Sequence, residues 1–256
     1  MVARTRLGLA LGTGLVVVGA LAGCGSDDPD AGTNGVGKLT PEEIESRTRA
    51  AAESATAVRM TGTVVSEGSR FRLDMRLNEA GGVGEVTKDG ATFELLRVGE
   101  DLYLRADEEF YRDHDENGGS SQDAGSDEGH AAVAEGAADK LKDKYLKVPS
   151  DDPSYQQLSG FTDLQVLLDG FLVLHGELEK GERGEVNGTR TVTLTADDGR
   201  GGSVQVSLED TPYPLRYTRA RGGGELELSD YNKDFTLRAP DAKHIVDYGD
   251  QVVDSR

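Results

Sequence analysis

The spacing of apolar and polar positions changes from a helical period to a period of two near residue 57. Thr40-Pro41-Glu42-Glu43 predicts the start of a helix that runs to about Ala55, because threonine suits the N-cap, proline the first helical position and Glu43 a capping box. In RFRLDMRLN (70–78) apolar residues then alternate strictly with charged ones. This alternation predicts antiparallel strands with one apolar face and one charged face.

Short alternating runs continue along the chain in two series, separated by glycine-rich or charged breaks. They cover 83–88, 91–98 and 101–105, and later 181–187, 189–196, 202–208, 212–220 and 224–230. Asn187-Gly188 and Asp198-Gly199 suit hairpin turns. A short helix is expected over 137–145, a strongly apolar helix over 161–174, and an irregular or weakly helical tail after 239.

Two runs of strands with helical material between them predict an α+β fold. We expect a single domain over 39–250, in which one curled antiparallel β-sheet forms a half-barrel covered by a few α-helices. Two segments contain few apolar residues that could be buried. Segment 24–38 is therefore predicted to be a flexible tether, and segment 113–135 a disordered acidic insert.

The start of the chain has the layout of a secretory signal peptide. Arg4 and Arg6 precede an uncharged run over 7–21, which is shorter than the roughly 18 to 20 residues that span a bilayer. Leu21-Ala22-Gly23-Cys24 then resembles a bacterial lipobox. In that resemblance residues 1–23 are removed and Cys24, the single cysteine, carries acyl chains that anchor the protein to the outer face of the cytoplasmic membrane. The alternative is a buried structural cysteine.

Composition narrows the classes of partner. The formal net charge is −19, so the chain is a poor partner for nucleic acid and is repelled by anionic headgroups. Acyl chains rather than surface charge must therefore hold it at the membrane. The acidity itself is typical of a soluble domain exposed at a cell surface.

This order of elements resembles the LppX/LprG group of actinobacterial lipoproteins and their distant relatives LolA and LolB. The resemblance lies in the lipobox, the first helix with its two strands, DLYLRA (101–106), DKYLKVP (143–149) and the leucine-rich helix over 161–174. It implies an unclosed half-barrel whose cavity accepts acyl chains, such as palmitate, of lipids or lipoproteins. It also implies a carrier or chaperone between membrane and envelope.

The apolar strand faces and the leucine-rich helix supply the candidate ligand cavity. The candidates are Val58, Met60, Val64, Phe71, Leu73, Met75, Leu77, Leu167, Leu168, Phe171, Val192, Leu194, Val204, Val206, Leu226 and Leu228. The alternative is an ordinary packed core, because an apolar strand face is more often core than pocket. A carrier should have a cavity of several hundred Å³ (roughly the lower range of ligand pockets) lined by these residues. A scaffold or protein-binding module should have a packed interior.

No pattern in the chain indicates catalysis. The four histidines are not spaced as metal ligands, and there is no P-loop, nucleophile elbow or dinucleotide-binding glycine motif. We therefore expect no enzyme, no cofactor and no metal site; a hydrolase would need titratable side chains gathered in one cleft. The expected partners are acyl lipid or lipoprotein acyl chains and the membrane through Cys24. In the alternative function, an envelope protein contacts the acidic insert.

Overall fold

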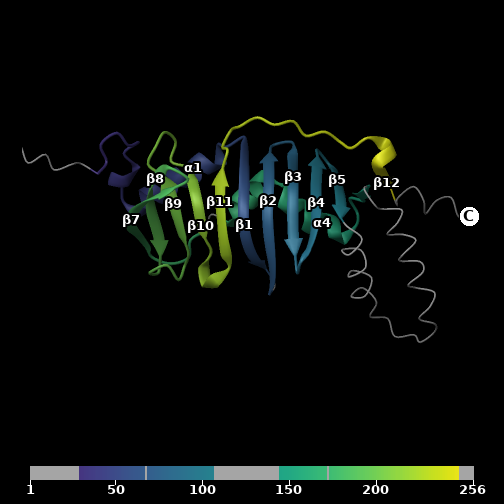
Figure 1. Ribbon diagram of the computed structural model, residues 1–256. Helices are drawn as coiled ribbons and strands as arrows, with labels where there is room; N and C mark the ends of the chain where they lie inside the picture. Colours follow the sequence, from purple (N-terminus) through teal and green to yellow (C-terminus); the bar gives the residue numbers. More distant parts are fainter. Residues whose placement is uncertain (1–28, 67, 107–143, 172, 248–256) are drawn as a thin grey trace, which may run out of the picture.

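In a computed structural model of the chain, residues 29–66, 68–106, 144–171 and 173–247 are described. Their strands form one sheet of 12 strands in the order β12-β6-β5-β4-β3-β2-β1-β11-β10-β9-β8-β7 (Figure 1). The strands are β1 Ala57–Ser66, β2 Ser69–Asn78, β3 Gly81–Lys88, β4 Ala91–Val98, β5 Asp101–Ala106, β6 Tyr145–Val148, β7 Leu178–Val186, β8 Thr189–Ala196, β9 Ser203–Ser207, β10 Pro214–Thr218, β11 Gly224–Ser229 and β12 Ile245–Asp247. The sheet curls without closing into a barrel, as the sequence predicts.

The two series of strands meet in the middle of the sheet, where β1 pairs with β11. The neighbouring pairs are antiparallel except for β12, which runs parallel to β6. Register aligns the apolar positions across strands, because Met60 lies opposite both Met75 and Leu228. One face of the sheet is therefore apolar over both halves.

Helices lie on this apolar face, behind the sheet in Figure 1. They are α1 Pro41–Glu53, α4 Pro153–Ser159, the 3₁₀ turn η2 Gly160–Thr162 and α5 Leu164–Phe171; the other 3₁₀ turns are η1 Val36–Lys38, η3 Ala220–Gly222 and η4 Ala242–His244. We call the face beneath the helices the inner face and the opposite one the outer face. The first helix begins as predicted: Glu43 N donates to Thr40 Oγ1 at 3.3 Å, and Thr40 N donates to Glu43 Oε2 at 3.0 Å.

The second helical region differs from the single helix expected over 161–174. Helical structure already begins at Pro153 and is interrupted at Asp163, whose backbone is extended. The Asp163 carboxylate accepts from the backbone N–H groups of Gln165 and Val166 at 3.1 and 3.0 Å. This N-cap starts α5, so a side-chain bond to the backbone divides an apolar run that looks continuous in sequence.

Three other expectations differ in detail. Tyr145 begins strand β6 rather than ending a helix, and the tail contains the short strand β12. Residues 29–38 were expected in the tether, but they pack at the β7–β9 end of the sheet: Asn34 N donates to Leu208 O at 2.8 Å, and Val36 is buried. The signal peptide, Cys24, the insert at 113–135 and most of the helix expected over 137–145 lie outside the described residues.

Candidate ligand-binding interior

The predicted cavity residues come together on the inner face. With two exceptions they are at most 5 % exposed. Phe71 is half-buried with its ring centroid 5.8 Å from that of Phe161, and the side chain of Phe171 lies outside the described part. The strand alternation therefore gathers the strand members of this set on one face; that they line a ligand cavity stays a prediction.

Among the described residues, the interior between sheet and helices is packed. The buried lining residues belong to one hydrophobic cluster that joins both halves of the sheet. A hollow of about 10 Å³ touches the predicted set at Leu194 and Val204, beneath Thr48 of α1 and beside Leu174. That volume holds about one water molecule.

Larger hollows lie elsewhere, among charged side chains. One of about 840 Å³ is lined by His175, Asp197, Arg200, Gly201, Ala220 and Arg221; one of about 490 Å³ is lined by Glu100, Asp101, Lys147, Val148, Pro149, Ser150, Asp151 and Tyr155. Neither contains a predicted lining residue. An acyl chain would therefore need the helices to move.

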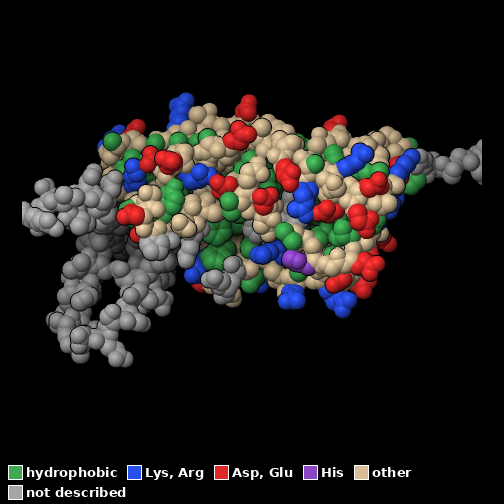
Figure 2. All heavy atoms as spheres, turned by 180° about the vertical axis from the view of Figure 1, so that it is seen from behind, with side chains coloured by type: hydrophobic (Ala, Val, Ile, Leu, Met, Phe, Trp, Pro, Cys, Tyr) green, Lys and Arg blue, Asp and Glu red, His purple; other side chains and the backbone are tan. Residues whose placement is uncertain are grey.

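The helical cover is in two parts. Helix α1 packs against β7, β8 and α5, whereas η2 packs against β2, β3 and β4. Figure 2 views the molecule from this side and shows apolar side chains reaching the surface among charged ones. Val166 of α5 and Val173 just after it are the large apolar side chains most exposed in the described chain, at 56 % and 37 %.

An arginine on the inner face holds the N-terminal end of α5. Arg97 of β4 donates from Nε to Thr162 Oγ1 at 3.0 Å, from a terminal nitrogen to Thr162 O at 2.9 Å, and to the Asp163 carboxylate at 3.2 Å. Its side chain is only 15 % exposed. These bonds satisfy a largely buried cation while fixing the cover to the sheet.

A tyrosine holds the segment that follows α5. The hydroxyl of Tyr217, on β10, donates to Val173 O at 2.6 Å. Tyr217 is 3 % exposed, and burial raises the pKa of its hydroxyl. The hydrogen bonds of Arg97 and Tyr217 therefore hold the two ends of the α5 region to strands in opposite halves of the sheet. We call each of these two attachments a clasp.

Neither clasp was predicted as functional from the sequence. The available signal was the position of Arg97, which occupies an inner-face place in a strand whose preceding inner-face residues are Phe93 and Leu95. A cation at such a position needs a buried partner. What that partner would be could not be deduced without the fold.

Within the described ranges, no three His, Cys, Asp or Glu side chains are grouped so as to hold a metal ion. No described helix combines the length and hydropathy required to cross a bilayer.

Comparison with known proteins gives structural neighbours only: no family model and no curated protein matches the chain. It is similar to LprF from Mycobacterium bovis, at 12 % identity and a TM-score of 0.49, over 78 % of this chain and 96 % of that one. It is also similar to the Mycobacterium tuberculosis lipoprotein LppX, at 13 % identity and a TM-score of 0.44, over 77 % and 98 %.

Proposed function

We propose that this chain is an envelope lipoprotein, anchored through Cys24 to the outer face of the cytoplasmic membrane, that binds acyl chains of a lipid or lipoprotein, or another amphiphile, without catalysis. The supporting observation is the inner face itself. Apolar side chains line both halves of an open sheet, and short helices, rather than a second sheet, cover them.

The structure corresponds to a closed state in this proposal. Acyl chains would replace the helical cover on the inner face, and each buried methylene would contribute about 0.8 kcal/mol. Opening breaks the Tyr217–Val173 hydrogen bond first, because it is a single neutral bond, whereas Arg97 makes several bonds to Thr162 and Asp163.

Lipid uptake by a soluble form tests this proposal. The form should begin at Gly25, so that it lacks Cys24 but keeps the packed residues 29–38. Native mass spectrometry should find co-purified lipid, and a fluorescent fatty acid should bind. Tyr217→Phe should accelerate uptake by about fivefold, since a typical hydrogen bond contributes about 1 kcal/mol.

Tyr231→Phe is the matched control. Tyr231 is partly buried and also donates to a backbone carbonyl, Pro214 O, at 2.7 Å, but this bond does not involve the cover. Its uptake rate should equal that of the parent. A bare mass with no fatty-acid uptake would exclude acyl binding, and equal acceleration by both variants would exclude the clasp.

The anchor has its own test. Labelled palmitate supplied to the expressing cells should be incorporated into the parent chain and not into Cys24→Ala, which should leave the membrane fraction. Label retained by Cys24→Ala would exclude lipidation at this residue.

A second function is supported by the packed interior. The predicted lining residues form a continuous core, which is the arrangement expected of an envelope scaffold or protein-binding module. In that case the form beginning at Gly25 carries no lipid and binds no fatty acid, while the anchored chain retains a protein partner after crosslinking on intact cells.

A further inference from the structure

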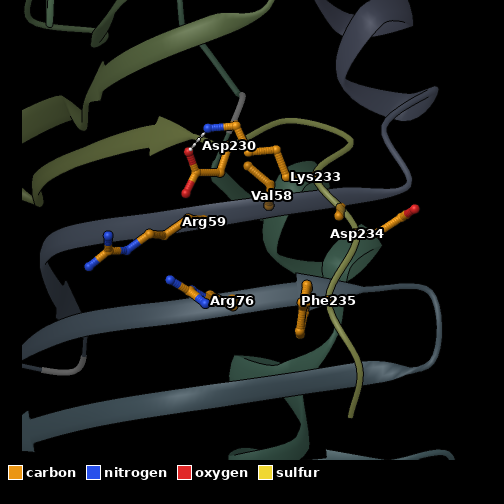
Figure 3. A pocket seen from close by; sticks show the side chains of 8 residues that line it. Val58, Arg59, Arg76, Asp230, Lys233, Asp234 and Phe235 are labelled. Atoms are coloured by element: carbon orange, nitrogen blue, oxygen red, sulfur yellow. Dashed lines mark hydrogen bonds and ion pairs between the residues drawn. The ribbon is translucent and has the colours of Figure 1, made fainter.

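A separate hollow lies on the outer face, at the corner where the chain leaves β11. It has a volume of about 180 Å³ and is lined by Ala57, Val58, Arg59, Arg76, Asp230, Lys233, Asp234 and Phe235. Figure 3 shows Arg59 and Arg76 extending side by side from the neighbouring strands β1 and β2. The hollow does not depend on any opening of the inner face.

The two arginines form an unusual pair. Arg59 and Arg76 lie directly opposite each other in the β1–β2 register, where like charges destabilise a sheet. Asp74 neutralises one of them, accepting from Arg59 Nε at 3.0 Å and from a terminal nitrogen at 2.8 Å. With the described residues, Arg76 makes no hydrogen bond or ion pair. Its guanidinium is therefore available for an anion.

The acidic side chains that line the hollow do not form an ion pair with Arg76. The Asp230 carboxylate accepts from Lys233 Nζ at 2.7 Å, and Figure 3 shows Asp234 pointing away from Arg76. The Lys233 bond, with smaller contributions from the charges of Arg59 and Arg76, lowers the pKa of Asp230. Among the lining residues, the guanidinium of Arg76 is therefore left without a carboxylate partner.

The walls of the hollow are fixed in advance. Asn232 holds the corner to the start of β1: its backbone N–H donates to Ala57 O at 2.9 Å, and its side-chain oxygen accepts from Thr56 N at 2.8 Å. Farther along, Asn78 Nδ2 donates to Phe235 O at 3.3 Å. Asp230 and Asn232 both adopt positive φ, 55° and 57°, a conformation that Asp and Asn tolerate better than most residues. A preformed site loses less entropy on binding.

We propose that this hollow binds a small anion, a phosphate or carboxylate group carried on a compact apolar body. The guanidinium of Arg76 would bind the charged group in the bidentate geometry that arginine favours. Ala57 and Phe235 supply the apolar part of the lining beside it. No bond is made or broken in the ligand.

Arg72 provides a matched control on the same strand. It is exposed on the same face, lies between Thr63 and Thr87 in the register, and does not line the hollow. Like Arg76, it makes no hydrogen bond or ion pair with the described residues. Arg76→Gln and Arg72→Gln therefore remove the same exposed charge, and only one of them removes the site.

The test is an NMR titration of the purified full chain, following the arginine Nε–H signals, with inorganic phosphate and then phenyl phosphate. Saturable shifts should appear at Arg76 and not at Arg72. Arg76→Gln should weaken phosphate binding about tenfold or more, as expected for a charge-assisted hydrogen bond, and Arg72→Gln less than about twofold. Phenyl phosphate should bind more tightly than phosphate, and Phe235→Ala should remove that advantage.

Equal, non-saturating shifts at both arginines would show only a general charge effect and would overturn the site. Unchanged binding in Arg76→Gln would do the same. If phosphate binds at Arg76 but phenyl phosphate gains nothing, the apolar part of the proposal is wrong. The results with inorganic phosphate do not depend on acyl-chain binding, because this anion has no apolar tail to enter the inner face.

Discussion

The two faces of this sheet are built from the same strands, but one face is apolar and buried and the other is charged and exposed. In β2, Leu73, Met75 and Leu77 are buried beneath the helices, while Asp74 and Arg76 between them are exposed. Hydrophobic burial therefore dominates one face and ion pairs the other. In the proposed function, stability and acyl-chain binding compete for the inner face, whereas the exposed charged positions of the outer face can change at little cost to folding.

The largest difference in stability between the two faces is expected from alanine substitutions at two adjacent residues of β2. Leu73→Ala should lower the free energy of unfolding by about 3 kcal/mol, because it removes a fully buried side chain and leaves a cavity. Arg72→Ala should change it by less than about 0.5 kcal/mol. Urea denaturation followed by circular dichroism measures both, and similar losses would show that the outer face is not the permissive one.

A smaller change in the free energy of unfolding is expected for a substitution in helix α1 of the helical cover. Thr48 is 4 % exposed, and its hydroxyl has no hydrogen-bond partner among the described residues. Thr48→Val keeps the shape and removes the unsatisfied group, so it should raise the free energy of unfolding by about 1 kcal/mol.

Thr162→Val is the control for this change. Thr162 is equally inaccessible, but its hydroxyl accepts from Arg97 and donates to Ser159 O at 2.8 Å. The same substitution should destabilise here by about 1 kcal/mol or more. The opposite signs are the prediction; stabilisation at both sites would show that hydrogen bonding does not govern the cover.

The outer face offers a pH-dependent test at Tyr145. Burial and a hydrogen bond to Glu94 raise the pKa of Tyr145 to about 12. The folded state then holds this proton more tightly than the unfolded state, whose pKa is about 10. The resulting stabilisation is complete below pH of about 10 and is lost as the pH rises toward about 12.

Tyr145→Phe should remove that alkaline component and lower stability near neutral pH by about 1 kcal/mol. Tyr217 and Tyr231 also have raised pKa values, so some alkaline loss should remain. The measurement is urea unfolding at a series of pH values from 8 to 12. An unchanged pH dependence in Tyr145→Phe would contradict the assignment.

Predictability from the sequence follows the same division between faces. Period-two alternation located most strands, because each inner-face residue repeats the same environment at every second position. It could not locate Arg97 and Tyr217 as clasps, since their partners, Thr162 and Val173, are about 65 and 44 residues away in the chain. It also missed Leu96 and Tyr103, which are buried on the outer face.

The smallest predicted effect concerns the arginine pair. Asp74→Asn leaves Arg59 and Arg76 opposite each other without the carboxylate that neutralises Arg59, so it should destabilise by about 0.5 kcal/mol, the scale of an exposed ion pair. The loss should shrink in 1 M salt, where the screening length falls to about 3 Å. Glu85→Gln is the control: Glu85 lies directly opposite Asp74, so removing its charge relieves a repulsion and should stabilise slightly. Equal losses from the two variants, unaffected by salt, would mean that charge does not organise the outer face.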